Sequence, residues 1–374
     1  MKRLLLPSVA GFLMIAAPFA GAQARRTSLA HKASPGRPAV RRAPPPVDPT
    51  EGDNVDGEDL EVRRAAVAAL GDIRGSVVVA DPNTGRILTM VNQKLGLQAG
   101  FIPCSTIKLV TSLAALNEHV VAPDAQIHIG RYTSFNLTNA IAHSNNEYFG
   151  VLGTRLGFAR VTHYAELLGL GEKAGWEIPG EQPGTVAAAP PKAGGMGLMT
   201  AYGEGFQVTP LELTALVSSI ANGGTLYYLQ YPRSDDDVFH FTPRVKRALE
   251  LDPQSFADLK VGMRGAVEYG TATRAAYASD EAVLGKTGTC TDFNSATHMG
   301  WFGSFNDVGN HQLVVVVMLT AVNKTVSGGA ASAVAGAIYK SLAEQRYFTA
   351  DGGDKRPSPF QILVSTPTAD IRKR

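Results

Sequence analysis

The chain has 374 residues, of which 44% are hydrophobic and 18% charged, and its formal net charge at pH 7 is +2. This composition fits an ordinary globular core, and the small net charge argues against a protein that binds nucleic acid. The eight histidines and two cysteines show no spacing typical of metal ligands, so we expect no metal site and no cofactor.

The N-terminus has the pattern of a secretory signal. Lys2 and Arg3 precede an apolar run over residues 4–20, followed by Gly-Ala-Gln-Ala. This pattern predicts a signal peptide over residues 1–24 with cleavage after Ala24. An uncleaved membrane anchor is the alternative, disfavoured because two prolines and a glycine interrupt a run that is short for a membrane span. Both readings place the body of the protein outside the cytoplasm, in an oxidising, periplasmic compartment.

Residues 25–60 contain few apolar side chains that could form a buried core. Basic residues at the start give way to three prolines at 44–46 and then to an acidic stretch over residues 48–61. We therefore expect a disordered tether that acts as a spacer, although its basic half could also contact an anionic envelope surface. The tail over residues 348–374 is polar and charged, and we expect it to be loose.

Regular patterns begin at Leu60. Helical spacing predicts a first helix over residues 60–70, and a second helix is expected to start at Ser105 within a mostly helical middle that extends to about residue 225. The closing helix is expected over residues 330–345. Strands are predicted over residues 76–80, 86–90, 283–289, 297–305 and 312–321. Strands at both ends with helices between them predict an α+β fold, in which the terminal strands form one antiparallel sheet.

The first candidate for chemistry is a Ser-x-x-Lys pair. Ser105 and Lys108 lie three residues apart on a predicted helix, so their side chains share one face. A serine hydroxyl becomes a good nucleophile only beside a base, and a lysine can serve if burial or a nearby cation lowers its pKa. An isolated Ser-x-x-Lys is more often a helix cap with a solvated lysine, but this is the only such pair in the chain.

A Ser-x-Asn triplet occurs three times, starting at Ser134, Ser144 and Ser304. Ser134 follows Lys108 too closely to allow a helix and a return loop between them. Ser304 lies after the Lys-Thr-Gly segment described next. We therefore favour the triplet that runs from Ser144 to Asn146.

The Lys-Thr-Gly-Thr segment at residues 286–289 closes a strand pattern. A phosphate-binding Walker A loop is excluded, because the glycine that it needs five residues before Gly285 is Asp280. In a strand beside Ser105, Lys286 would place a positive charge in the cleft.

These three elements in this order are the active-site motifs of serine enzymes that react with penicillin, and the chain resembles the transpeptidase domain of penicillin-binding proteins. The hairpin around Asp81, the segment from Tyr202 to Gly224 and the Trp301-Phe302 pair extend the resemblance over most of residues 75–340. It implies one domain over residues 61–347, with an antiparallel sheet flanked by helices and an all-helical subdomain. No glycosyltransferase domain precedes residue 60, so we expect the transpeptidase domain to stand alone or to dock onto a glycan polymerase.

The resemblance also implies a reaction. A serine D,D-transpeptidase acts on the D-Ala–D-Ala ends of peptidoglycan stem peptides and is acylated by β-lactam antibiotics. In this pattern Ser105 is the nucleophile, Lys108 takes its proton, and Ser144 relays a proton to the leaving amine. Asn146 would hold the substrate amide. The substrate carboxylate would meet Lys286, Thr287 and Thr289, with Gly288 between the two threonines, and the N–H groups of Ser105 and Thr289 would form the oxyanion hole.

Cys104 and Cys290 flank two motifs that must meet in space. In a secreted chain with an even number of cysteines, a disulfide between them is expected. The same pair of positions is bridged in some serine carbapenemases, so the alternative that this protein is a β-lactamase stays open. The Glu-x-x-Leu-Asn pattern that carries the deacylating base of class A β-lactamases does not occur after Asn146. A D,D-carboxypeptidase also remains an alternative function. A non-catalytic β-lactam sensor is disfavoured, because no transmembrane signalling segment follows the domain.

Overall fold

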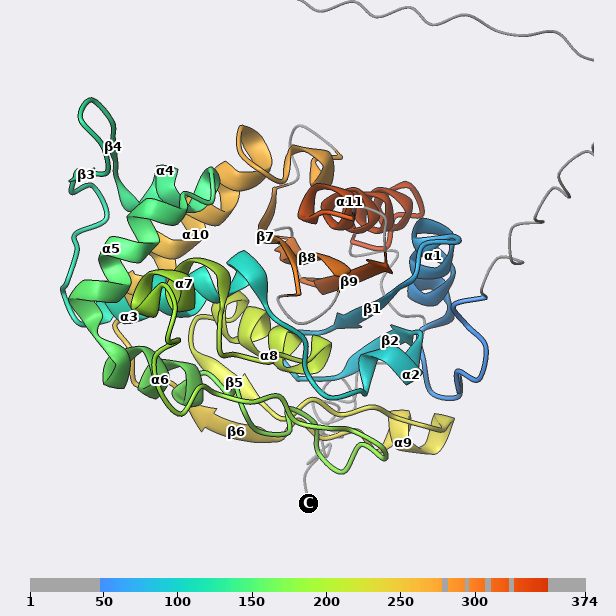
Figure 1. Cartoon of the computed structure of the whole chain (residues 1–374). Coiled ribbons are helices and arrows are strands. Elements are labelled where there is room, and N and C mark those ends of the chain that lie inside the picture. The colour runs from blue at the N-terminus through green and yellow to red at the C-terminus, as the bar shows by residue number, and fades with distance from the viewer. Residues whose placement is uncertain (1–47, 278–281, 293–295, 307–310, 323–325, 349–374) are drawn as a thin grey trace, which may run out of the picture. The chain divides into compact units, whose positions relative to one another are not determined.

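The computed structural model describes residues 48–277, 282–292, 296–306, 311–322 and 326–348 (Figure 1). The predicted signal peptide, the first part of the predicted tether and the predicted tail after residue 348 lie outside these ranges. Within these ranges, no helix has both the length and the apolar character that a membrane crossing requires.

A five-stranded antiparallel sheet organises the described chain. Its strand order is β2-β1-β9-β8-β7, so the N-terminal hairpin joins the C-terminal strands through the pairing of β1 with β9. The strands are β1 (Gly75–Ala80), β2 (Ile87–Val91), β7 (Val283–Thr291), β8 (Thr297–Asn306) and β9 (Val314–Val322). Each strand begins and ends within two residues of its predicted bounds, so the predicted strands are confirmed. The α+β fold class is also confirmed.

Both faces of this sheet are covered, which explains why its central strands are apolar at nearly every position. Val77 and Val79 point into a core with α1 (Leu60–Leu70) and α11 (Gly328–Glu344) on one face. Val78 belongs to the core on the other face, where α8 (Pro210–Ala221) packs (Figure 1). Every residue of α8 is buried, so this helix lies at the centre of the molecule.

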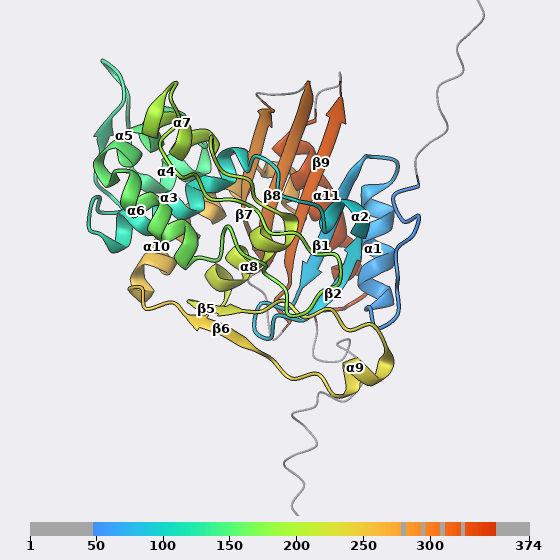
Figure 2. The same cartoon turned by 60° about the horizontal axis from the view of Figure 1, so that its bottom comes forward.

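A helical half lies beside the β7 edge of the sheet (Figure 2). It contains a 3-10 turn, η1 (Cys104–Ile107), and the helices α3 (Lys108–Asn117), α4 (Leu137–Ala142), α5 (Asn146–Leu156), α6 (Phe158–Leu167), α7 (Gly195–Tyr202) and α10 (Pro253–Glu268). The remaining short elements are α2 (Gln93–Gly96), β3 (Ile127–His128), β4 (Ser134–Phe135), β5 (Thr225–Tyr227), α9 (Asp235–Phe239), β6 (Val245–Ala248) and η2 (Thr273–Ala275). The helix expected to start at Ser105 therefore begins at Lys108, after the 3-10 turn that holds the serine.

The prediction of a disordered tether is wrong for residues 48–59. Glu58 is buried, and its carboxylate accepts hydrogen bonds from Arg63 Nη1 at 2.9 Å and from Thr89 Oγ1 at 2.7 Å. Asp53 forms an ion pair with Arg63 Nη2 at 2.9 Å and accepts a hydrogen bond from the backbone N–H of Gln93 at 2.8 Å. These acidic residues are thus not free charges of a spacer, because they pair with a buried arginine and with backbone donors at the end of β2.

Candidate active site

The Ser-x-x-Lys pair lies where η1 meets α3. Because Ser105 precedes the first residue of α3 by one helical turn, Lys108 Nζ reaches Ser105 Oγ at 2.7 Å. Ser105 Oγ also lies 3.3 Å from the carbonyl oxygen of Ala201, near the end of α7. Ser105 is buried with 8% of its surface exposed, and Lys108 is fully buried. The pair thus has the geometry of a nucleophile and its base.

The Ser-x-Asn triplet lies in the turn between α4 and α5. Ser144 has a positive φ of 54°, a conformation that costs a non-glycine residue energy and that recurs at functional sites. The side chain of Asn145 caps α5 by accepting a hydrogen bond from the N–H of Tyr148 at 2.8 Å. Lys108 Nζ lies 3.2 Å from Ser144 Oγ and 2.6 Å from Asn146 Oδ1. The turn therefore directs both polar side chains at the buried lysine.

Lys286 reaches the same point from β7. Its Nζ donates to Ser144 Oγ at 2.8 Å and to the carbonyl oxygen of Thr287 at 3.0 Å. The polar atoms of the three motifs therefore form one continuous chain, Ser105 Oγ to Lys108 Nζ to Ser144 Oγ to Lys286 Nζ, in this structure. Residues from three separate parts of the sequence meet within hydrogen-bond distance.

The electrostatics of the two lysines favour a neutral base. Burial, together with the positive charge of Lys286, lowers the pKa of Lys108 well below its ordinary value. Burial alone lowers the pKa of Lys286 to about 7. In the described part of the chain, neither ammonium forms an ion pair with a carboxylate. The lowered pKa makes the neutral form of Lys108 easier to reach, and a neutral amine at this position could accept a proton from Ser105.

The rest of the Lys-Thr-Gly-Thr strand packs against η1. A Cβ atom at Gly288 would lie 2.9 Å from the carbonyl oxygen of Pro103 and 3.2 Å from Cys104 Cβ, so only glycine allows this close approach. Thr287 Oγ1 lies 2.6 Å from Thr271 Oγ1, and Thr289 Oγ1 accepts a hydrogen bond from the N–H of Gly328 at 2.8 Å. Both threonine hydroxyls are thus held in place by neighbouring elements.

A disulfide joins Cys104 to Cys290, as the sequence predicted. Their Cα atoms are 5.6 Å apart, although 186 positions separate them in the sequence. The bond links the residue before Ser105 to the residue after Thr289. A hydrogen bond of 3.0 Å from Trp301 Nε1 to the carbonyl oxygen of Ile102 ties β8 to the same segment. The segment that carries Ser105 is therefore anchored to the sheet by a covalent and a polar contact.

Two residues beside these motifs were missed by the sequence analysis. Tyr202, the last residue of α7, accepts a hydrogen bond at its Oη from Asn146 Nδ2 at 2.7 Å. Thr271 follows α10 and contacts Thr287. Tyr202 lies in a segment that supported the family resemblance but suggested no role, and no pattern in the sequence pointed to Thr271.

The two other Ser-x-Asn triplets lie elsewhere. Ser134 lies in β4, where its Oγ pairs with His128 Nδ1 at 2.8 Å. Ser304 is buried in β8, and its Oγ donates to the carbonyl oxygen of Val315 at 3.0 Å. These contacts occupy both hydroxyls away from Lys108 and support the choice of Ser144.

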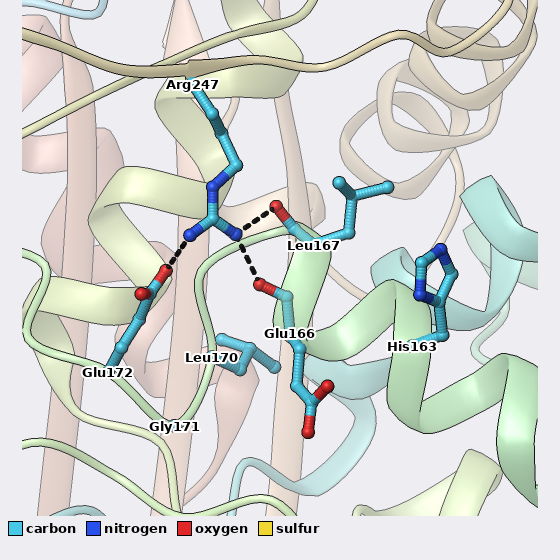
Figure 3. Close-up of a pocket in the computed structure, with 7 residues that line it drawn as sticks. All are labelled: His163, Glu166, Leu167, Leu170, Gly171, Glu172 and Arg247. Atoms are coloured by element: carbon cyan, nitrogen blue, oxygen red, sulfur yellow. Dashed lines mark hydrogen bonds and ion pairs between the residues drawn. The ribbon is translucent and has the colours of Figure 1, made fainter.

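A cavity of about 370 Å³ lies between α6 and the β5–β6 ribbon (Figure 3). Arg247 crosses it and donates to the carbonyl oxygens of Glu166 at 2.7 Å and Leu167 at 3.0 Å, and to Glu172 Oε1 at 2.7 Å. These polar groups satisfy one another, and no residue of the three motifs lines the cavity. It is therefore a structural hollow at the end of α6 and not the candidate active site.

Comparison with known proteins agrees with the motifs. Residues 75–344 match the family described as the penicillin binding protein transpeptidase domain. The chain is 27% identical over 269 residues to stage V sporulation protein D of Bacillus subtilis, and the match covers 64% of this chain and 41% of that protein. It is 22% identical over 365 residues to the peptidoglycan D,D-transpeptidase MrdA of Haemophilus influenzae, covering 74% of this chain and 53% of that protein. The chain thus spans about two fifths to one half of the length of these curated relatives.

The fold is also found among solved structures. PBP2 of Pseudomonas aeruginosa superposes with a TM-score of 0.66 at 23% sequence identity, and the alignment covers 79% of this chain and 78% of that one. The family match extends over well more than half of the chain and includes all three motifs. This chain therefore belongs to the penicillin-binding protein transpeptidase family.

Proposed function

We propose that this protein is an extracytoplasmic serine D,D-transpeptidase that acts on peptidoglycan stem peptides ending in D-Ala–D-Ala. The observation that carries the proposal is the polar chain from Ser105 Oγ through Lys108 Nζ and Ser144 Oγ to Lys286 Nζ. Its support also includes relatives that are named peptidoglycan D,D-transpeptidases. β-Lactams would acylate the same serine.

The proposed reaction begins with proton transfer. Neutral Lys108 Nζ accepts the proton of Ser105 Oγ as that oxygen forms a bond to the carbonyl carbon of the penultimate D-Ala. The N–H groups of Ser105 and Thr289 stabilise the oxyanion. The C–N bond then breaks, and the proton held by Lys108 reaches the departing D-Ala amine through the hydroxyl of Ser144. This leaves an acyl-enzyme on Ser105 and releases neutral D-Ala amine.

The substrate is held from both sides of the scissile bond in this proposal. Protonated Lys286 and the hydroxyls of Thr287 and Thr289 would bind the terminal carboxylate, and Asn146 would bind an amide group on the acyl side. An amine of a second stem peptide resolves the acyl-enzyme in crosslinking, and water resolves it in carboxypeptidase action. Within the described residues, the only side chain that hydrogen-bonds Ser105 is Lys108. No carboxylate of the described residues hydrogen-bonds Ser105, which supports slow hydrolysis, against a β-lactamase.

We also propose that the functional domain begins near residue 48 and not at residue 61, because residues 48–59 pack on the body through Asp53 and Glu58. Its C-terminal limit stays near residue 347, shortly after the family match ends. The signal peptide over residues 1–24, the periplasmic location and docking onto a glycan polymerase stay predictions of the sequence.

A peptide that ends in L-Lys–D-Ala–D-Ala tests the activity. We expect the purified protein to release D-Ala from diacetyl-L-Lys–D-Ala–D-Ala, and the Ser105→Ala variant to release none. Adding a D-amino acid acceptor should divert product from the hydrolysed peptide to the acceptor-linked peptide if the enzyme is a transpeptidase. Hydrolysis alone would identify a carboxypeptidase, and release that does not depend on Ser105 would overturn the proposal.

The pH dependence of the acylation rate should reflect the protonation states of Lys108 and Lys286. The rate rises with pH as Lys108 loses its proton, because only neutral Lys108 can act as a base. It falls again near pH 7, because burial lowers the pKa of Lys286 to about 7 and the deprotonated side chain no longer attracts a carboxylate. Lys286→Arg keeps its charge to far higher pH, so the fall near pH 7 should disappear. An unchanged alkaline fall in this variant, measured with benzylpenicillin, would show that another group titrates.

A further inference from the structure

Three aromatic side chains lie in a row beside the turn that carries Ser144. The ring centroids of Phe135 and His143 are 6.2 Å apart, and those of His143 and Tyr269 are 5.7 Å apart. His143 is exposed, Tyr269 is 49% exposed and Phe135 is half-buried. Single exposed apolar residues are common on protein surfaces, whereas a contiguous group of them marks a contact surface. This aromatic row is therefore a candidate binding surface.

The aromatic row is held by the same segments that build the site. The N–H of Thr271 donates to the carbonyl oxygen of Ala142 at 3.0 Å, which joins the end of α10 to the end of α4 (Figure 1). The ring of Tyr269 lies over Gly265, where a Cβ atom would come within 2.8 Å of the ring carbon Cζ. Tyr269 Oη donates to Asn139 Oδ1 at 3.2 Å. The backbone of α10 and a side chain of α4 thus fix the position of the tyrosine ring.

The aromatic row lies on the leaving-group side of the scissile bond in the proposed mechanism. His143 directly precedes Ser144, which relays the proton to the departing amine. Tyr269 precedes Thr271 by two residues, and Thr271 Oγ1 lies 2.6 Å from Thr287 Oγ1, a hydroxyl assigned to the carboxylate of the departing D-Ala. By microscopic reversibility, the amine that resolves the acyl-enzyme enters where the first amine left. The acceptor therefore approaches from the side of the aromatic row.

We propose that Phe135, His143 and Tyr269 form the docking surface for the acceptor stem peptide. The group that they contact is the methylene chain that links the reactive side-chain amine of a diamino acid to its peptide backbone. Burial of methylene groups against aromatic rings is favourable. This inference rests on the proposed function and adds the acceptor to it. The surface makes the enzyme prefer acceptors with a long side chain over short ones.

The transfer that this docking serves uses the residues already assigned to the reaction. The neutral acceptor amine forms a bond from its nitrogen to the acyl carbon, and the bond from that carbon to Ser105 Oγ breaks. The proton that the amine loses passes through the hydroxyl of Ser144 to neutral Lys108 Nζ and from there to Ser105 Oγ. The products are a new amide and the free serine. The aromatic row takes no part in the proton transfer and acts only by binding.

Two acceptors that compete in one reaction test the surface. The donor is diacetyl-L-Lys–D-Ala–D-Ala, and the acceptors are glycine and the stem tripeptide L-Ala–γ-D-Glu–meso-diaminopimelic acid. Both reactive amines lie next to a carboxylate, but glycine has no methylene chain that could reach the aromatic row. In Tyr269→Ala we expect the ratio of tripeptide-linked to glycine-linked product to fall about four- to fifteenfold, as for the lost burial of one or two methylene groups.

The control variants separate binding from a structural role. Tyr269→Phe keeps the ring and loses only the bond to Asn139, so it should keep the wild-type ratio. His143→Ala should lower the ratio in the same direction as Tyr269→Ala. Phe239→Ala, at an exposed aromatic residue of α9, should leave it unchanged. A wild-type ratio in both alanine variants of the row, or an equal loss in Tyr269→Phe, would overturn the acceptor surface.

The wild-type protein distinguishes this inference from the proposed function on which it rests. Release of D-Ala from the donor without any preference for the tripeptide over glycine would overturn the acceptor surface alone. A wild-type protein that releases no D-Ala would instead overturn the proposed function, and the acceptor surface with it.

Discussion

Replacing Lys108 by methionine is expected to slow acylation of Ser105 by benzylpenicillin by about 10²–10⁴-fold, the range for loss of a general base. Lys108 Nζ is the only side-chain group of the described residues within hydrogen-bond distance of Ser105 Oγ. Methionine fills a similar volume in this buried position, so the loss reports the missing base and not a cavity. The rate of covalent adduct formation under excess antibiotic is the quantity to measure.

A matched variant shows whether the loss is specific. Lys94→Met removes an exposed lysine of α2 and should leave the rate unchanged. The pH profile adds a second check, because the remaining activity of Lys108→Met should lose the rise with pH that deprotonation of Lys108 causes. A variant that keeps the wild-type rate and the wild-type pH profile would contradict the role of Lys108 as base.

Removing the disulfide by the double substitution Cys104→Ser with Cys290→Ser should lower the free energy of unfolding by about 3–5 kcal/mol. The bond closes a loop of 186 positions, and a loop of this length strongly restricts the unfolded chain. Replacing both cysteines avoids leaving a single reactive thiol. Urea unfolding of the oxidised wild type and of the double variant, under the same conditions, gives the difference.

The disulfide should also affect the site, since Cys104 precedes Ser105 and Cys290 follows Thr289. Without it, η1 is held against β7 mainly by the close approach at Gly288 and by the Trp301 hydrogen bond to Ile102. We expect acylation of the double variant to be slower than that of the wild type well below its unfolding midpoint. Wild-type protein treated with a reductant should behave as the double variant does. Equal unfolding midpoints for all three would contradict the prediction.

The sheet was predictable because its sequence signals are local. Strands β1 and β9 are apolar on both faces, and a turn sequence separates β1 from β2, so short apolar runs located them well. Helix α10 was not predicted, although Phe256, Leu259 and Met263 follow helical spacing after a capping Asp252. The error at residues 48–59 has another cause. The acidic composition of that stretch suggested solvation, and only the tertiary structure reveals Arg63 as its buried partner.

The sequence predicted the candidate site less completely than it predicted the sheet. Spacing alone placed Ser105 and Lys108 on one face, because a separation of three residues is a property of the helix itself. The meeting of this pair with Ser144 and Lys286 was expected from the family resemblance and not from any local pattern. Tyr202 is 56 positions from Asn146, and its contact depends on how α7 packs against α5. Contacts of this kind follow from the tertiary fold, so no sequence period reveals them.

The most direct test of the acyl-enzyme is the intact mass of the protein after exposure to benzylpenicillin, followed by mapping of the modified peptide. We expect one covalent adduct per chain, located on the peptide that contains Ser105, which persists for many minutes after free antibiotic is removed. The Ser105→Ala variant should form none. An adduct on another residue, or its absence from folded wild-type protein while the antibiotic stays intact, would contradict the assignment of Ser105 as the nucleophile.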